Sequence, residues 1–470
     1  MRDLPGSKAV GPAKTLFCTL FLCLFSPFSP ASKSIDLSHL QFQPAPLGSS
    51  ANSAYQDLKA SGPASGILNL SGAPGSGAGA DTISAYQASI SSSEAAEGPY
   101  AESIAEKALS LAQLYQTTGQ HELALKTFEQ ALQVRRVNYG LYDLGQAPIL
   151  RGMVESYMAL GEIIHAHEKQ QLLFSIYLQN YGPDDPEILP ALLDWADWNV
   201  TLYLQQKSLD LNAEYFTSDP MQQRVSPNPI LLQAQNIYIA TMDLIKRQNG
   251  LGDPRLISIE RKLASINYIS NEELNNFLNH MPVSVGGDEG FNAYRRSLIQ
   301  SNDAHFFSGS DALKRAIAYS YNTPNTETRE IAERILELGD WYLLFDKRAD
   351  ALEIYQQALE LLTDTPMSKE KIEEIMSPGM PVQIPEFENR FVRDKDTDFK
   401  GYIDVEFTLS KFGMASRAEV INASSQDKDD VARIERELMR SIHSCKFRPK
   451  FVAGSPAHQE KVRLRYYYTY

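Results

Sequence analysis

A two-helix pattern that recurs along the chain constrains its fold more than any other feature of the sequence. Between Leu111 and Ala131, small residues alternate with large apolar ones at helical spacing, and a turn at Gly119 divides the stretch in two. Two antiparallel helices can approach closely where the small residues lie, while the large side chains fill the remaining gaps. Because one such pair cannot bury its apolar face alone, we expect a stack of pairs.

The order of small and large residues resembles the tetratricopeptide (TPR) repeat. The first clear copy consists of Leu111, Ala112, Tyr115, Gly119, Ala124, Phe128 and Ala131, and the last consists of Leu338, Gly339, Tyr342, Ala351, Tyr355 and Ala358. Tyr139-Gly140 recurs 42 residues later as Tyr181-Gly182, a spacing that resembles the lengthened repeats of kinesin light chains. The resemblance implies an α-solenoid of TPR helix pairs over residues 101–365, with an inner groove that binds peptides.

Some TPR domains bind C-terminal carboxylates through a Lys and an Asn on the inner helix of the repeat. At the matching positions this chain has Leu109 and Gln113 in the first copy, and Leu336 and Asp340 in the last. The resemblance therefore does not imply a receptor for chaperone tails. We expect the polar side chains of Gln113, Gln116 and Asp340 to contact a protein partner.

The C-terminal part of the chain changes from helical to alternating periodicity. Residues 402–410 place four apolar residues on one face and Asp404, Glu406 and Thr408 on the other, which is typical of a half-buried strand. A second strand is expected at about 415–422, an amphipathic helix at about 430–444 and a last strand at 461–470. The order predicts a small α+β (ββαβ) domain over residues 381–470.

Several separate motifs in this region resemble the TonB C-terminal domain. They are Gly401-Tyr402-Ile403-Asp404-Val405, the turn Lys411-Phe412-Gly413, Lys446-Phe447-Arg448-Pro449, and Gly454 followed by Pro456. The resemblance implies a periplasmic domain that adds its sheet edge to a strand from an outer-membrane receptor. We expect the last strand to be that edge, with Lys461, Arg463, Arg465 and Tyr467 as partner-binding residues.

The N-terminal residues 1–31 have the pattern of a secretory signal peptide. Arg2, Lys8 and Lys14 precede an uncharged apolar run from Thr15 to Phe25, which is shorter than the roughly 20 residues that cross a bilayer. The pattern predicts export to the periplasm, and a retained membrane anchor is the alternative. Cleavage would remove Cys18 and Cys23 and leave only Cys445, so no internal disulfide is expected.

Residues 32–100 are rich in Ser, Ala, Gly and Pro, and this composition predicts a flexible tether. No other run of membrane-spanning length follows, so we expect the mature chain not to span a membrane.

The composition and the missing motifs limit the classes of function. A formal net charge of -14 argues against a general nucleic-acid binder, and neither a phosphate-binding loop, an H-E-x-x-H helix nor a G-x-S-x-G elbow occurs. Glu162, together with His165, His167 and Glu168, has a spacing that could bind a metal on one helix, but a solvated polar face is the simpler interpretation. Trp195 and Trp198 are expected in the core.

These features together predict a non-enzymatic adaptor of the cell envelope, without a cofactor or a metal, that binds proteins through the groove and by strand addition. The alternative is an energy transducer for outer-membrane transport, which would need a retained N-terminal anchor. The flexible tether and the solenoid depart from the pattern of such transducers.

Overall fold

The computed structural model describes most of the chain between residues 41 and 469, namely residues 41–46, 78–209, 229–280, 289–385, 401–425 and 431–469. The predicted signal peptide, which contains Cys18 and Cys23, lies outside these residues. The chain divides into two compact units. One contains residues 65–334 and 385–393, and the other contains residues 1–64, 335–384 and 394–470.

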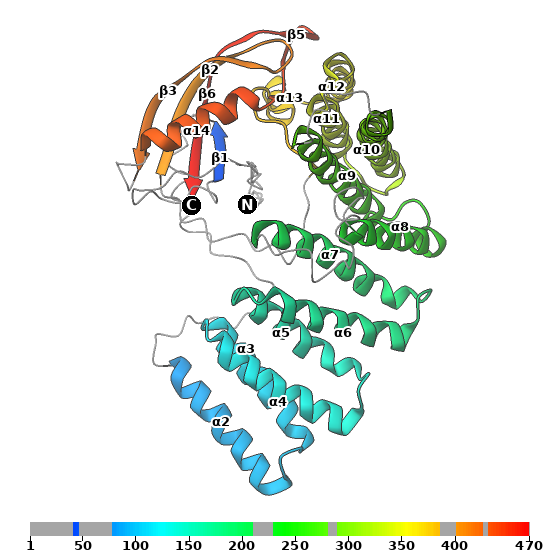
Figure 1. Cartoon of the computed structure of the whole chain (residues 1–470), viewed down its shortest axis with the longest axis vertical. Helices are drawn as coiled ribbons and strands as arrows, with labels where there is room; N and C mark the ends of the chain where they lie inside the picture. Colours follow the sequence, from blue (N-terminus) through cyan, green and yellow to red (C-terminus); the bar gives the residue numbers. More distant parts are fainter. Residues whose placement is uncertain are drawn as a thin grey trace, which may run out of the picture. The chain divides into compact units, whose positions relative to one another are not determined.

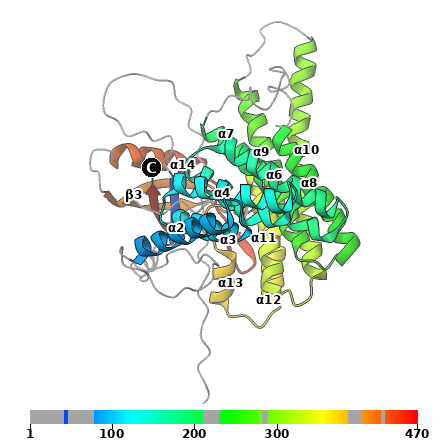
Figure 2. The same cartoon turned by 90° about the horizontal axis from the view of Figure 1, so that it is seen from below.

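The first unit is a solenoid of consecutive helices, and neighbours in sequence pack on each other (Figures 1 and 2). Its helices are α2 (Ala78–Glu97), α3 (Glu102–Thr117), α4 (His121–Tyr139), α5 (Ala147–Ala159), α6 (Ile163–Tyr181), α7 (Leu189–Leu209), α8 (Pro229–Asn249), α9 (Arg255–His280) and α10 (Glu289–Asn322). From α3 onward they form the pairs α3–α4, α5–α6, α7–α8 and α9–α10. The prediction of an α-solenoid is confirmed. None of the described helices combines the length and apolar character needed to cross a membrane.

The ends of α4 and α6 repeat one local arrangement. Gly140 and Gly182 follow these helices with φ angles of 90° and 75°, which glycine adopts without strain. The Asn138 side-chain amide donates to the carbonyl of Tyr100 at 2.9 Å, and 42 residues later Asn180 donates to the carbonyl of Tyr142 at 2.8 Å. Short 3₁₀ helices, Leu144–Gln146 and Pro186–Ile188, then lead into the next pair. The 42-residue repeat seen in the sequence is therefore a structural repeat.

The expected packing of small against large residues is present in the first pairs. Phe128 is fully buried on α4, and a Cβ placed on Gly152 of α5 would lie 2.3 Å from its ring. Ala112, Ala124 and Ala131 are also fully buried. The helices approach closely only because these positions carry no larger side chain.

Helix α2 lies inside the segment predicted to be a tether, so that prediction is wrong over residues 78–97. Gln87 of α2 donates to the Tyr115 hydroxyl at 2.7 Å, and Lys107 donates to Ser93 at 2.7 Å. The many Ala residues of this stretch favour a helix, and α3 supplies the surface on which Ile90 is buried.

The second unit contains an antiparallel sheet in the order β1-β6-β2-β3, with α14 across one face (Figure 1). Its elements are β1 (Gln41–Pro46), β2 (Gly401–Leu409), β3 (Ala415–Ser425), α14 (Val431–Ser444), β4 (Lys450–Val452), β5 (Ser455–Ala457) and β6 (Gln459–Thr469). The core between sheet and helix contains Ile403, Val405, Phe407, Leu409, Ile434, Leu438, Ile442, Phe447, Val462, Leu464, Tyr466 and Tyr468. The predicted ββαβ order is present, while β1 and the β4–β5 hairpin were not predicted.

The last helix pair belongs to this second unit, which moves the predicted domain boundary. Helix α11 (Thr328–Leu344) begins in the first unit and ends in the second, where α12 (Arg348–Thr363) and α13 (Lys369–Met376) follow. After α13 the backbone pairs with the segment before β4, since Gly379 donates to the Arg448 carbonyl at 2.9 Å and Val382 donates to that of Lys446 at 2.8 Å. The sheet is thus built directly on the last repeat.

Candidate protein-binding surfaces

Strand β6 lies between β2 and β1, so the prediction that the last strand is the sheet edge is wrong. Residues 41–46, from the predicted tether, pair antiparallel with β6 from Gln41 opposite Thr469 to Pro46 opposite Leu464. On the other side, β6 pairs antiparallel with β2. The edge strands of this sheet are β1 and β3.

The two arginines of β6 are paired with acidic residues of β2 on the sheet face opposite α14. Arg465 donates to Asp404 at 2.7 Å, and Arg463 donates to Glu406 at 2.6 Å. The hydrogen bond to Asp404 raises the pKa of Arg465 further above its usual value. The guanidinium of Arg465 also lies 3.9 Å from the centre of the Tyr402 ring. The expected basic surface is therefore largely neutralised by the neighbouring strand.

The other two predicted residues of β6 have different surroundings. The Tyr467 side chain is buried, with its ring edge-on to that of Tyr402 at 6.4 Å between centres. Lys461 is exposed near the start of the strand, with a φ of 53°. Arg463 also keeps an exposed side chain. The contact of these residues with a partner stays a prediction.

Asp340 is buried in the second unit and its carboxylate is engaged within the chain, so its predicted contact with a partner is wrong. Its carboxylate accepts hydrogen bonds from the Tyr355 hydroxyl at 2.7 Å and from both Nε and Nη2 of Arg448 at 2.9 and 2.6 Å. Burial, together with the Asp340 charge, raises the pKa of Tyr355 well above its usual value. The ion pair of Asp340 and Arg448 connects the last repeat to the segment before β4.

The two glutamines of the first repeat differ in their contacts. Gln116 donates to the Gly152 carbonyl at 3.2 Å and to Glu155 at 3.1 Å, so it connects α3 with α5. Gln113 has an exposed side chain. Their roles in partner binding stay predictions.

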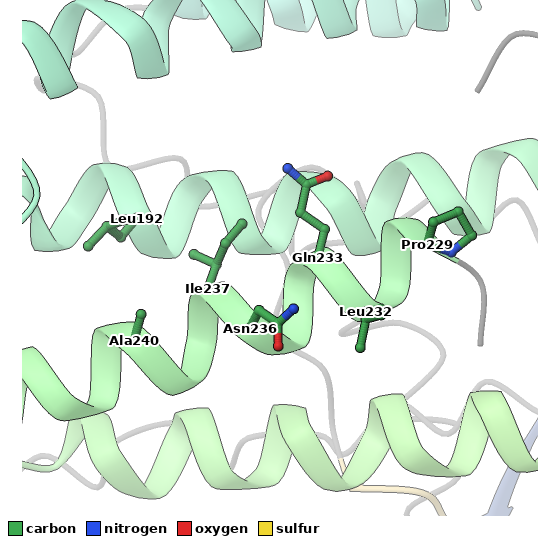
Figure 3. A pocket seen from close by; sticks show the side chains of 7 residues that line it. All are labelled: Leu192, Pro229, Leu232, Gln233, Asn236, Ile237 and Ala240. Carbon is green, nitrogen blue, oxygen red and sulfur yellow. The ribbon is translucent and has the colours of Figure 1, made fainter. Parts of the chain in front are cut away.

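An apolar depression between α7 and α8 was missed from the sequence. Its volume is about 370 Å³, and it is lined by Leu192, Pro229, Leu232, Gln233, Asn236, Ile237 and Ala240 (Figure 3). Leu192 comes from α7 and the other residues from α8. Leu232 is 41% exposed, so its side chain is accessible to a partner at this depression. An open apolar depression of this size can accept an apolar side chain of a peptide.

A buried cluster of polar and charged side chains connects α7, α8 and α9. Lys262 donates to both carboxylate oxygens of Asp197 at 2.7 and 2.8 Å, and the Tyr238 hydroxyl donates to the same carboxylate. Burial, followed by the Asp197 charge, raises the pKa of Tyr238 well above its usual value. Each of these buried polar groups therefore has a partner on a neighbouring helix.

The histidines that could have bound a metal are engaged in other contacts. His165 lies 3.0 Å from Glu162, while His167 Nδ1 accepts a hydrogen bond from the Trp198 indole at 2.9 Å and stacks on Trp195. Burial lowers the pKa of His167. Within the residues that the structure describes, His, Cys, Asp and Glu side chains form no group of three that could hold a metal ion. Trp195 and Trp198 are buried, as expected.

No family model and no curated protein sequence matches the chain. Among solved structures, BtubC (BKLC) from P. vanneervenii is similar with a TM-score of 0.35 and 15% identity, over 68% of this chain and 99% of that one. A putative kinesin light chain with nearly identical TPR-like repeats from Podosopora anserina has a TM-score of 0.35 and 15% identity, over 58% of this chain and 100% of that one. At this level of similarity, the description of the solenoid rests on its own helices and contacts.

Proposed function

We propose that this protein is a non-enzymatic protein-interaction adaptor that binds one partner on its solenoid and another by strand addition to the C-terminal sheet. The observation that carries the proposal is the seating of an extended segment, residues 41–46, along β6. Because β1 and β2 occupy the two sides of β6, a partner strand would bind there in place of residues 41–46 and use the same backbone groups. The solenoid supplies a second surface, distinct in chemistry.

The solenoid surface is the apolar depression between α7 and α8. Its polar lining residues, Gln233 and Asn236, can donate to and accept from the backbone of a bound peptide. Leu232 and Ile237 provide the apolar contact that gives such binding its free energy.

The proposed location is the periplasm, as part of the cell envelope. The support is the signal-like pattern of residues 1–31 and the resemblance of residues 401–470 to the TonB C-terminal domain. In the alternative function, an energy transducer for outer-membrane transport, residues 1–31 stay in the inner membrane. The N-terminal residue of the mature protein distinguishes the two: a chain that starts near Ser32 supports the adaptor, and a chain that retains residue 1 supports the transducer.

The solenoid partner is tested by charge substitution in the depression. Leu232→Arg places a charge among apolar lining residues, and we expect it to remove at least one protein that copurifies with the full chain from envelope extracts. Ile239→Arg is the matched control, because Ile239 is on the same helix and also 41% exposed but does not line the depression. Equal recovery with both variants would overturn the proposed surface.

A further inference from the structure

The register of β1 on β6 places its apolar residues and its glutamines opposite different residues of β6. Three residues of β1, namely Phe42, Pro44 and Pro46, lie opposite Tyr468, Tyr466 and Leu464. These three β6 residues belong to the core under α14. Gln41 and Gln43 lie opposite Thr469 and Tyr467, at positions that belong to the other face. The segment therefore matches the two faces of the sheet, as a strand of the domain itself would.

The prolines of β1 fix which of its backbone groups bond to β6. In an antiparallel pair, the N–H and C=O of alternate residues point to the same neighbour. Proline has no N–H, so Pro44 and Pro46 fit only where the backbone groups point away from β6. The ladder to β6 is then left to Gln41, Gln43 and Ala45. The outward side of β1 lacks donors at both prolines, which blocks the addition of a further strand and makes β1 a terminal cap.

The contact between β1 and the sheet is small, and this limits how firmly β1 is held. Six residues form a single ladder on one side only. The gain from these few backbone hydrogen bonds is nearly offset by the conformational entropy lost when the segment is ordered. Because residues 41–46 belong to the same chain as β6, the segment competes with a partner strand as a tethered ligand after it dissociates.

We infer that residues 41–46 are a built-in ligand of β6 that competes with a partner strand for the same backbone groups. The inference rests on the proposed function and adds its regulation. The partner is an extended peptide with an apolar residue or proline at the positions of Phe42, Pro44 and Pro46. At the alternate positions, those of Gln41, Gln43 and Ala45, it has residues other than proline, whose N–H groups can donate to β6. The intact protein binds such a peptide only in the fraction of molecules in which β1 has dissociated from β6.

The experiment uses a fluorescent peptide with the sequence of residues 39–48 and the full chain with or without residues 41–46. We expect fluorescence anisotropy to show at least tenfold tighter binding to the chain without the segment. A peptide with Gln43→Pro loses a donor that points to β6, so its binding to the deleted chain should be at least tenfold weaker. The matched peptide with Gln43→Ala keeps this donor and should bind as the original does. Equal binding to both chains, or equal binding of the two substituted peptides, would overturn the inference.

A cross-link tests the same competition in the full chain without a deletion. Gln41→Cys with Thr469→Cys joins two residues that lie opposite each other, and its oxidation should abolish the binding of the peptide. Ala45→Cys with Thr469→Cys is the control, because these positions are not opposite and should not cross-link. A bridged chain that still binds the peptide would contradict strand competition. These results do not depend on the Leu232→Arg test, so the inference and the proposed function can fail separately.

Discussion

The buried pair of Asp340 and Arg448 determines how the last repeat and the sheet are joined within the second unit. Removal of one partner leaves the other charge buried without compensation, which typically costs about 3–5 kcal/mol. We therefore expect Arg448→Met to lower the free energy of unfolding of the second unit by about this amount in urea denaturation. Arg463→Met removes an exposed pair and should cost less than about 1 kcal/mol. Similar losses in both variants would show that Asp340 and Arg448 do not have this role.

His167 gives the solenoid a predicted pH dependence. Burial lowers the pKa of His167, partly opposed by Glu168, so the folded protein binds a proton here less readily than the unfolded chain does. The stabilisation is then complete above the ordinary histidine pKa of about 6.5 and is lost as the pH falls through the lower folded value. We expect unfolding free energy to decrease from pH 7 to pH 5, and to decrease less in His167→Gln.

The comparison for His167 is made in a His305→Gln background, because burial lowers the pKa of His305 as well. An NMR titration should give His167 a pKa below 6.5. A value above 6.5, or a pH dependence unchanged by His167→Gln, would contradict the assignment.

At the scale of single residues, the sequence predicts types of environment better than it predicts partners. The small position at Gly339 and the aromatic at Tyr355 follow from the repeat pattern, and a Cβ on Gly339 would lie 2.7 Å from that ring. The pairing of Asp340 with Arg448 spans 108 positions, and no local pattern encodes such a distance. The position of Asp340 between two core residues of the repeat was the one available signal, since a charge there needs a partner.

At the scale of helices, the close contact of α4 with α5 depends on Gly152. Gly152→Ala would place a methyl group against the buried Phe128 ring, and overpacking of this kind costs about 1–3 kcal/mol. We expect this loss in the unfolding free energy of the solenoid. Phe128→Leu makes room for the methyl group, so in that background Gly152→Ala should cost measurably less. Equal losses in the two backgrounds would show that the ring is not the cause.

The strands show why some elements were predicted and others were not. The strands β2, β3 and β6 have the alternating pattern of half-buried strands, and their expected bounds agree with the structure within a few residues. Strand β1 has two prolines and no β-branched residue, so its propensity argues against a strand. The pairing partner of β1 is the free side of β6, which exists only after β6 has paired with β2.

The charge pairs of the sheet could have been predicted once the strand order was known. Asp404 and Glu406 alternate on β2 as Arg463 and Arg465 do on β6, and an antiparallel register brings the two sets together. The sequence alone left open which strands are neighbours.

At the scale of the whole molecule, the two units do not follow the boundary between helical and alternating periodicity. The change of periodicity lies after residue 376, but the last helix pair shares hydrogen bonds and two ion pairs with the segment before β4. Lys446 donates to the Leu344 carbonyl at 2.8 Å and also pairs with Asp346. A unit is defined by such contacts, and periodicity reports only the local structure.

The adaptor proposal requires two separate partner surfaces on one chain. Site-specific photo-cross-linking in cells tests this most directly, with a benzoylphenylalanine residue placed at Leu232, at Thr469 or, as a control, at Ile239. We expect one protein to be captured from position 232, a different one from position 469, and neither from position 239. Capture of the same proteins from all three positions, or of none from 232 and 469, would contradict the adaptor.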